Sequence, residues 1–506
     1  MSRLSAICLA ALLAVISCSR ENPEPVIPDP APVDMTLSAD SAEADQAGGA
    51  LTLTVTSPVR PKVSSVPGWI VFKDGTFDNY RIQFAFSVSG NNSRTSRTAA
   101  IKLTAEGLEP RYFTISQPGL PDTPPPGPVE ETPEWETAVS AVRNMGAGWN
   151  LGNTLDSNSG DCNHMWIEAW TGRTVKDYET AWGQPLTTKA LIHMFKQAGF
   201  GAIRIPVTWY PHMGTITLHD SEKWDPSSGW SGSDVDPAWM ARVKTIVDYV
   251  LDEGLYCILN VHHDTGAADT AWLVASDAGF EAAKQRYQSL WGQIANTFKD
   301  YGERLLFESY NEMLDPYDSW CFASYATPGR FDSGVAISAY SAINRYARLF
   351  TATVRATGGN NVHRNLIVNT YGACSGDGTW NSHLSEPLTY MSAPEAPGHI
   401  AIEIHSYWDA SKFDSQKADI DRLFTNIDQH LVKRLGVPVI IGEWGGGADQ
   451  DTDANVRFAS YFSQKAKDSD VAAFWWMGLS DGADRATPAW TMPRTKDAIL
   501  KAYKKN

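Results

Sequence analysis

The sequence is poor in cysteine and in clustered positive charge, and both shortages narrow what the protein can be. Only 6 of its 506 residues are cysteines, which are too few and too widely spaced for a dense disulfide framework or a cysteine-ligated metal site. Lysine and arginine number 42 against 58 aspartates and glutamates, a net charge of −16. Because phosphate backbones are bound by clustered basic side chains, and no basic stripe is present, this composition argues against a nucleic-acid partner.

Long apolar runs are also missing, except at the N-terminus. The segment MSRLSAICLAALLAVISC places Arg3 before an apolar run that is too short for a stable membrane span, which is typical of a secretory signal. Its end, VISC, resembles a bacterial lipobox, so we expect residues 1–17 to be cleaved and Cys18 to carry a lipid that anchors the exported chain at the outer membrane and cell surface. Plain secretion with cleavage nearby is the alternative. The proline-rich residues 18–33 are expected to form a flexible tether.

A second proline-rich stretch divides the rest of the chain into two blocks. Residues 120–134 carry proline and acidic side chains with little to bury, so they predict a linker. A chain of 506 residues exceeds what one hydrophobic core normally holds. We therefore expect one folded domain over residues 34–119 and another over residues 135–506.

The first block is β in character and favours a small immunoglobulin-like β-sandwich. Its strand-like segments are residues 51–57, 81–89, 98–106 and 111–117. The block resembles the BACON domain of Bacteroidetes surface proteins through the stretches LTVTS, PGWI, NNSRTSRTAAI and ISQPG. The domain's name suggests carbohydrate binding, but beyond Trp69 we find no aromatic platform, and that residue also suits a core. We expect a spacer between the membrane and the second domain.

The second block alternates apolar, strand-like runs with helical patterns such as residues 236–254 and 337–358. Eight such runs alternating with helices predict a (β/α)₈ TIM barrel. The runs are residues 145–152, 201–207, 256–262, 305–311, 365–372, 400–407, 437–445 and 471–478.

Six of these eight runs carry polar or aromatic side chains at or near their ends, although buried polar groups cost free energy unless they are paired. Active groups of a barrel lie at the carboxyl ends of its strands, so these side chains should meet at one mouth. They are Arg204, His262, His263, Asp264, Asn311, Glu312, His405, Tyr407, Glu443, Trp475 and Trp476.

Glu312 and Glu443 are the pair that points to a reaction. They follow the fourth and seventh runs, whose ends face each other across a barrel mouth. Two carboxyls in one cleft can divide their protonation states, so that one is ionised while the other keeps its proton. Cleavage of a glycosidic bond needs that division: an acid for the leaving oxygen and a nucleophile for the anomeric carbon.

The second block also resembles glycoside hydrolase family 5, in the endo-β-1,4-glucanase group called subfamily 4. The motifs that carry the resemblance are GWNLGNTLD (148–156), ETAWGQPLTT (179–188), GFGAIRIPVTW (199–209), LNVHHD (259–264), LLFESYNE (305–312), IHSYWD (404–409), PVIIGEWG (438–445) and FWWMG (474–478).

The resemblance implies the roles of the central residues. Glu312 would be the proton donor and base, and Glu443 the nucleophile of a retaining double displacement that needs no metal or other cofactor. Arg204 and Tyr407 would hold Glu443 and keep it ionised. Asn311 would donate to the sugar 2-hydroxyl, a contact that strengthens at the transition state.

The resemblance also implies a set of surrounding residues. Trp476 would stack under the sugar at the point of cleavage, and Asn153 would contact substrate from the first motif. The family commonly has Asp-Asn-Gly after this tryptophan where this chain has MGLSDGADR, so Trp475 and Trp476 both remain candidates. Three histidines would line the site and orient its groups: His262, His263 and His405.

The expected substrate is a β-1,4-glucan. Xyloglucan is favoured because a surface lipoprotein with a BACON spacer resembles the xyloglucan endo-hydrolases of gut Bacteroidetes, while mixed-linkage glucan and cellulose stay open. The enzyme is expected to be a monomer. Two long tryptophan-rich loops, residues 154–183 and 208–239, follow the first two runs and should wall the cleft. Some of their tryptophans are expected to form glucan subsites: Trp166, Trp170, Trp224 and Trp230.

Two other functions fit parts of the pattern. A metal-dependent barrel hydrolase would use His262, His263, Asp264 and His405 as ligands. Such barrels usually carry a histidine pair on the first strand, and GWNLGN has none. The other is a non-catalytic glycan-binding protein on the same scaffold, against which the intact pair of glutamates argues.

Overall fold

The computed structural model describes residues 32–119 apart from 47, 92 and 94, and then residues 135–317, 332–376, 386–447, 450–476 and 482–504. The predicted signal, the lipid-bearing Cys18, the tether up to residue 31 and the linker 120–134 lie outside these residues. Within them, no helix has the length and apolarity that crossing a membrane requires.

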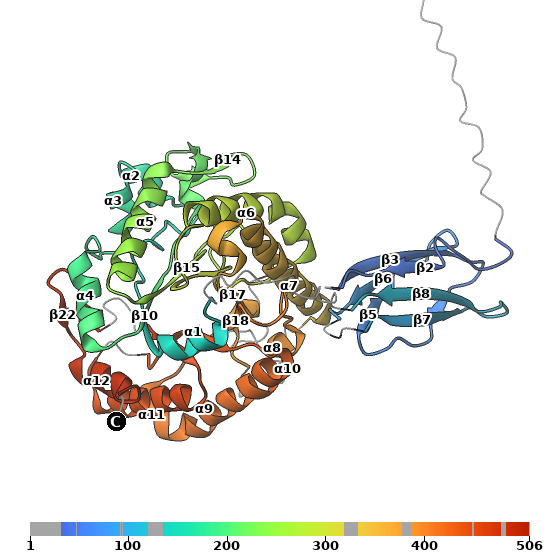
Figure 1. Ribbon diagram of the computed structural model, residues 1–506. Helices are drawn as coiled ribbons and strands as arrows, with labels where there is room; N and C mark the ends of the chain where they lie inside the picture. Colours follow the sequence, from blue (N-terminus) through green and yellow to red (C-terminus); the bar gives the residue numbers. More distant parts are fainter. Residues whose placement is uncertain are drawn as a thin grey trace, which may run out of the picture.

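The second block forms a closed barrel of eight parallel strands, which confirms the predicted TIM barrel (Figure 1). The last strand pairs with the first and so closes the sheet. In chain order the strands are β9 (Ala147–Asn150), β10 (Ala202–Ile205), β15 (Tyr256–Asn260), β16 (Leu305–Glu308), β17 (Leu366–Asn369), β18 (Ile400–Tyr407), β19 (Val439–Gly445) and β20 (Ala472–Trp475).

Helices surround the barrel, and α5 shows why they form where they do (Figure 1). Asp236 caps its first turn by accepting from the Ala238 backbone N–H, and Pro237 occupies the first helical position, where no N–H is needed. The outer helices are α4 (Lys189–Ala198), α5 (Pro237–Asp252), α6 (Asp277–Thr297), α7 (Ser333–Ala356), α8 (Glu386–Tyr390), α9 (Phe413–Ile427), α10 (Lys433–Leu435), α11 (Asp453–Asp468) and α12 (Pro493–Lys501).

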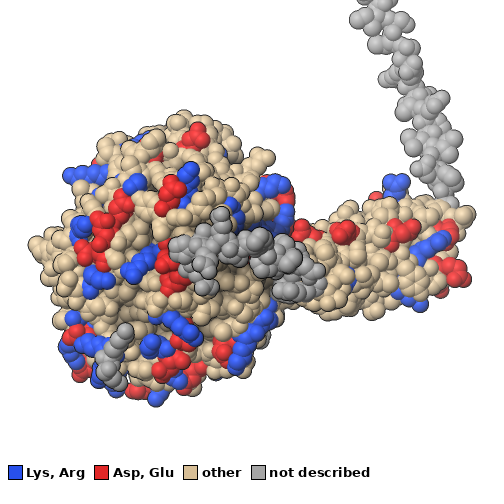
Figure 2. Space-filling model, viewed as in Figure 1, with Lys and Arg blue, Asp and Glu red and all other residues tan. Residues whose placement is uncertain are grey.

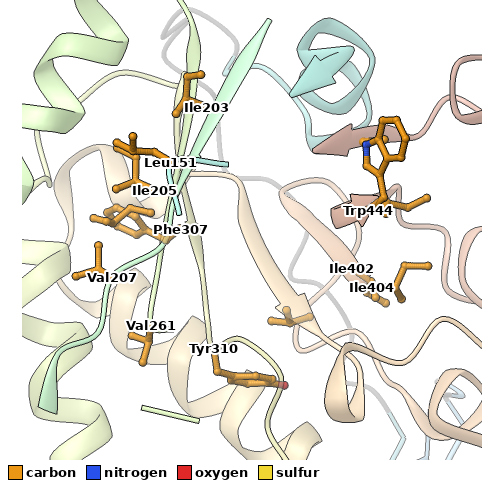
Figure 3. Packing of buried hydrophobic residues seen from close by; sticks show 14 of the residues in the cluster. Leu151, Ile203, Ile205, Val207, Val261, Phe307, Tyr310, Ile402, Ile404 and Trp444 are labelled. Atoms are coloured by element: carbon orange, nitrogen blue, oxygen red, sulfur yellow. The ribbon is translucent and has the colours of Figure 1, made fainter. Parts of the chain in front are cut away.

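The main hydrophobic core lies between the strands and this ring of helices. Ile203, Ile205 and Phe307 belong to it (Figure 3). A second apolar cluster fills the start of the barrel, where α1 (Ala138–Met145) packs against strand residues such as Ile258. Strand residues therefore alternate between an outer core under the helices and an inner core against α1, as a period of two requires.

The two long segments after β9 and β10 contain secondary structure of their own. They carry α2 (Trp166–Trp170), α3 (Val175–Glu179), η1 (Tyr210–His212), β11 (Met213–Ile216), β12 (Leu218–His219), β13 (Lys223–Trp224) and β14 (Trp230–Val235). Further short elements are η2 (Gly359–Val362), η3 (Tyr371–Ala373), η4 (Ala410–Lys412), η5 (Asp428–Val432), β21 (Ala483–Asp484) and β22 (Ala489–Trp490).

The first block is built of two four-stranded sheets, β1-β3-β6-β5 and β2-β8-β7-β4, which enclose their own core. Trp69 packs against that core beneath the guanidinium of Arg97, at 4.3 Å. The strands are β1 (Thr36–Leu37), β2 (Ser41–Glu43), β3 (Gly49–Thr56), β4 (Lys62–Val63), β5 (Ile70–Lys73), β6 (Arg81–Val88), β7 (Arg97–Thr104) and β8 (Arg111–Gln117).

The small domain lies beside α7 of the barrel (Figure 1). Arg348 on this helix is 3.4 Å from the Asp45 carboxylate and donates to the side chain of Gln46 at 3.1 Å. Acidic and basic side chains are interspersed over the face of the molecule seen in Figure 2. That face therefore presents no basic stripe of the kind a nucleic acid needs.

Candidate active site

The barrel interior changes from apolar to polar one layer below the mouth. On five strands an apolar residue of the cluster beside α1 is followed, two positions later, by a polar and fully buried side chain, and Asn150 on β9 supplies a sixth. Hydrogen bonds join them to one another or to Arg204, so they form one layer. Its members are Asn150, Arg204, Asn260, Glu308, Asn369 and Glu403.

Arg204 is the centre of this layer. Its Nε and Nη2 donate to the two carboxylate oxygens of Glu308, at 2.6 and 2.8 Å. Its Nη1 donates to Asn150 at 3.0 Å and to Glu443 at 2.9 Å. Glu403 lies 3.3 Å from Nη2. Burial pushes the pKa of Glu308 upward, but the guanidinium outweighs it and leaves that pKa below its usual value.

Glu443, the predicted nucleophile, is held by two donors from different strands. Its Oε1 accepts from Arg204, and its Oε2 accepts from the Tyr407 hydroxyl at 2.6 Å. Burial of the hydroxyl, and then the charge of Glu443, raise the pKa of Tyr407, so this group stays a donor. The structure thus brings together the three residues that the sequence predicted to act on one another, and it fixes the orientation of the carboxylate.

Glu312, the predicted proton donor, faces Glu443 across the mouth. One carboxylate oxygen of each lies within 4.8 Å of the other. His405 lies between them, with Nδ1 at 2.8 Å from Glu312 and 3.6 Å from Glu443. Its Nε2 points to Glu403 at 3.2 Å. Burial lowers the pKa of His405, but the surrounding carboxylates outweigh burial and raise it to about 10.

His262 is held in one tautomer by Asn260. The Asn260 Oδ1 accepts from the Val207 backbone N–H at 3.1 Å, so its Nδ2 donates to His262 Nδ1 at 3.0 Å. Burial lowers the pKa of His262 well below its usual value. The neutral ring therefore carries its proton on Nε2, which lies 3.9 Å from Glu443.

The structure separates the two tryptophans that the sequence left open. Trp476 stacks on His262, with ring centres 5.6 Å apart and planes 13° apart. Gly152 lies against its indole, and a Cβ there would come within 2.4 Å of the ring. Trp475 is fully buried in the main core instead. Trp476 is therefore the one beside the predicted catalytic groups.

Asn311, Asn153 and His263 lie at different distances from this centre. The Asn311 Oδ1 accepts from Arg204 at 2.9 Å, which leaves its Nδ2 hydrogens for a ligand. Asn153 adopts a positive φ of 57° and its backbone N–H donates to Asp156. His263 also lies beside Asp156, with Nε2 at 4.0 Å from the carboxylate. The last two residues thus belong to a neighbouring part of the mouth.

The rival set of metal ligands does not come together as the sequence suggested. Asp264 is buried and accepts from the Trp209 backbone N–H at 2.8 Å and from Trp272 Nε1 at 2.7 Å, so its carboxylate is engaged by the wall of the mouth. Among the described residues, donor atoms that lie within 4.8 Å of one another come from two other groups: Asp156, His262 and His263, and the catalytic-site group Glu312, His405 and Glu443.

Among the four tryptophans expected in glucan subsites, the expectation for Trp224 is wrong. It is 3% exposed and belongs to a small buried cluster under the segments after β9 and β10. Trp166 is half-buried against the main core. Trp230 lies under the Arg286 guanidinium at 3.3 Å, whereas Trp170 is 70% exposed. Only Trp170 presents most of its ring to solvent.

Most of the polar layer beneath the mouth was not predicted from the sequence. Five members of the layer lie inside apolar runs, whereas the predicted site residues lie at or near the ends of the runs: Asn150, Asn260, Glu308, Asn369 and Glu403. The available signal was a polar side chain within a run of otherwise buried residues, as in LLFE and IAIE.

A closed barrel with two facing glutamates at its mouth is an arrangement that glycoside hydrolases use. The chain belongs to the cellulase family, glycosyl hydrolase family 5, whose model matches residues 166–479. It is 32% identical over 391 residues to the cellulase/esterase CelE of Acetivibrio thermocellus, and 31% identical over 388 residues to endoglucanase A of Clostridium longisporum. These alignments cover 72% and 73% of this chain, but only 40% and 66% of the two relatives.

Solved structures of enzymes from the same family are also similar to this chain. A GH5-4 broad specificity endoglucanase from an uncultured bacterium shares 45% identity with a TM-score of 0.65, over 74% of this chain and 98% of that one. A family 5 glycoside hydrolase from Prevotella bryantii B14, solved as a mutant with the xyloglucan tetradecasaccharide XXXGXXXG, shares 38% identity with a TM-score of 0.61, over 74% of this chain and all of that one.

Proposed function

We propose that this protein is a retaining endo-β-1,4-glucanase that hydrolyses plant cell-wall β-glucan, with xyloglucan as its main substrate. The spacing of Glu312 and Glu443 carries the proposal, since one oxygen of each lies within 4.8 Å of the other. Retaining glycosidases place their two carboxyl groups about 5–5.5 Å apart, whereas inverting enzymes need about 6.5–9.5 Å to admit a water molecule.

In the first step the Glu443 carboxylate attacks the anomeric carbon while Glu312 gives its proton to the departing glycosidic oxygen. The bond to the leaving sugar breaks, and an ester joins the remaining glycan to Glu443. In the second step Glu312 takes a proton from water, which attacks the anomeric carbon and releases Glu443. The side chain of Glu312 is 27% exposed and that of Glu443 is 7% exposed, which suits a proton donor open to water and an enclosed nucleophile.

The neighbouring residues position the sugar and the nucleophile. Arg204 and Tyr407 fix the attacking carboxylate by donating to its two oxygens. Asn311 gives its free amide hydrogens to the 2-hydroxyl, and Trp476 offers a flat ring under the sugar. His262 presents its Nε2 proton beside Glu443.

The relatives support a β-glucan but divide on its kind. The Prevotella bryantii structure was solved with a xyloglucan oligosaccharide, which favours xyloglucan for this chain. The broad specificity endoglucanase is 45% identical and favours the alternative, activity on mixed-linkage glucan and cellulose as well. The reading of the chain as a non-catalytic glycan-binding protein is the remaining alternative.

A digest of four polymers side by side tests this proposal: xyloglucan, mixed-linkage glucan, carboxymethylcellulose and glucomannan. Xyloglucan should release reducing ends fastest. Similar rates on all β-1,4-glucans would replace xyloglucan preference with broad specificity. Binding to the polymers without any release of reducing ends would overturn the assignment as an enzyme.

Replacing Trp476 and Trp224 by alanine should give opposite outcomes. Trp476→Ala removes a stacking surface, so kcat/KM should fall about tenfold or more with little change in Tm. Trp224→Ala empties a buried cluster and should lower the free energy of unfolding by about 3–5 kcal/mol. Kinetics and urea denaturation of both variants check the pair. Weaker catalysis in Trp224→Ala at full stability would show that it, and not Trp476, faces the substrate.

We also propose that the chain is an exported, monomeric lipoprotein of the outer-membrane surface, and that its BACON-like sandwich acts as a spacer. Arg3, the following apolar run and the VISC motif support the anchor. The position of Trp69 beneath Arg97 supports a spacer more than a binding platform. Labelled palmitate should enter the wild-type protein in the membrane fraction and fail to enter Cys18→Ala. An unlabelled wild-type protein in the medium would leave plain secretion as the answer.

A further inference from the structure

More carboxyl groups gather around Arg204 and His405 than these two cations can neutralise. Arg204 is fully buried and contacts Glu308, Glu403 and Glu443, and His405 lies beside Glu312 as well as Glu403 and Glu443. Uncompensated charge in a buried site is costly, so a carboxyl that can keep its proton will do so. Glu308 is already tied to Arg204 by two short bonds, and Glu443 must be ionised to attack.

Glu403 is the group in a position to stay neutral. Its Oε1 lies 3.3 Å from Arg204 and 3.2 Å from His405, and both distances are longer than the 2.6 and 2.8 Å bonds between Arg204 and Glu308. Its Oε2 is buried, and no donor among the described residues reaches it. A proton on this carboxyl would let Glu403 donate to the neighbouring Glu308, an interaction that lowers the pKa of Glu308.

Groups from several strands of the barrel fix the surroundings of Glu403. The charged or titratable ones are Arg204 on β10, Glu308 on β16 and His405 on β18. On β19 the contact is Gly442, where a Cβ would come within 1.7 Å of the Glu403 oxygen. Burial first, and then the charge of Glu308, raise the pKa of Glu403 to about 8 against the opposing effects of Arg204 and His405.

We propose that Glu403 works as a neutral, protonated carboxyl and is a positioning residue of this site, which leaves Arg204 to Glu443 and holds His405 against Glu312. The proposal deepens the proposed function and rests on it for its catalytic consequence. When Glu403 releases its proton to solvent at alkaline pH, a third carboxylate competes with Glu443 for Arg204. The same charge draws the His405 ring away from Glu312, so turnover falls.

Thermal unfolding of the full chain tests the proton on Glu403 without any need for activity. A carboxyl whose pKa is raised on folding stabilises the fold fully below its unfolded value, and this contribution is lost as pH rises through the folded value. The wild type should therefore lose Tm relative to Glu403→Gln between about pH 4.5 and about pH 8, by about 2 °C or more. A gap that stays constant over this range would overturn the proposal.

Glu308→Gln is the matched control, since it makes the same atomic change in the same buried layer. The pKa of Glu308 is lowered on folding, so its stabilising contribution is present above the unfolded value and is lost toward acid. This variant should therefore be less stable than the wild type at neutral pH, and the two should converge as pH falls. If both variants show the same trend with pH, the protonated group is not Glu403.

The catalytic consequence is measured as the pH dependence of kcat/KM on an aryl β-cellotrioside. The leaving group of this substrate needs no proton, so the fall of kcat/KM at alkaline pH does not reflect the titration of Glu312. The wild type should lose kcat/KM near pH 8, and Glu403→Gln should shift this limb upward by at least about one pH unit. An identical limb in both proteins would overturn the positioning role.

Infrared spectroscopy of the wild type keeps the proposal testable if the glutamine variant does not fold. A protonated carboxyl band should disappear between about pH 7 and about pH 9.5. Its absence at neutral pH would overturn the proposal. A protein that hydrolyses no glycan yet shows this band and the Tm divergence would refute the proposed function and leave the neutral Glu403 standing.

Discussion

Glu443→Gln should abolish hydrolysis, with kcat falling by at least about 10⁴-fold while oligosaccharides still bind. The amide cannot form the ester that the double displacement requires, but it occupies the same volume between Arg204 and Tyr407. Initial rates on xyloglucan measure kcat, and calorimetric titration with a xyloglucan oligosaccharide measures the affinity for the ligand. Turnover within tenfold of the wild type would remove Glu443 from the chemistry.

Glu312→Gln is the informative partner variant, because it removes the proton donor and leaves the nucleophile. On polysaccharide, loss of an acid/base group should cost about 10²–10⁴-fold. With an activated aryl leaving group, the first step should proceed nearly as in the wild type and the covalent intermediate should accumulate as a burst. If Glu312→Gln and Glu443→Gln each lost as much activity on the aryl glycoside as on the polysaccharide, the two glutamates would not have separate roles.

Arg204→Met should cause the largest loss of stability of any single substitution in the polar layer. The side chain keeps its bulk but leaves Glu308, Glu403 and Glu443 without their shared cation. Breaking a buried ion pair from one side typically costs about 3–5 kcal/mol, and the loss should shrink as acid protonates the carboxyls. Urea denaturation at neutral and at acidic pH measures the loss in the free energy of unfolding under each condition.

Arg143→Met provides the comparison, because Arg143 forms an exposed ion pair with Asp470 at 2.9 Å in which both side chains are more than half exposed. Exposed pairs contribute about 0–1 kcal/mol. If Arg204→Met were no less stable than this surface variant, the polar layer would not depend on its central charge.

The barrel could be predicted from the sequence because its signals are local and repeated. Each strand is an apolar run, and helices such as α5 carry caps and an apolar face that are visible without any partner. The residues at the mouth follow from the same argument, since every parallel strand delivers its end to the same rim. Glu312 and Glu443 were found in this way although they are far apart in sequence.

The polar layer beneath the mouth could not be predicted in the same way. A run of buried residues does not reveal which members face α1 and the barrel axis and which face the outer helices. That assignment depends on the register between neighbouring strands, which pairs Asn260 with Glu308 and Asn369 with Glu403. Only the closed barrel shows that Glu308 and Glu403 share Arg204, and that Asn260 and Asn369 donate to Glu308.

Two further differences have simple physical causes. The sequence around Trp224 predicts a loop, but β12 and β13 pair there and the ring is buried. In the sandwich, the four longer strands were predicted, whereas β1, β2, β4 and β5 were not. Strands of two to four residues are too short to show a period of two.

Trapping the covalent intermediate tests the central claim most directly. A 2-deoxy-2-fluoro-cello-oligosaccharide with a dinitrophenolate leaving group allows the first step and slows the second, so the ester accumulates and peptide mass spectrometry can locate it. The mechanism predicts a single glycosyl adduct on the peptide that contains Glu443 and none in Glu443→Gln. An adduct on Glu312, or hydrolysis with inverted anomeric configuration and no adduct, would contradict it.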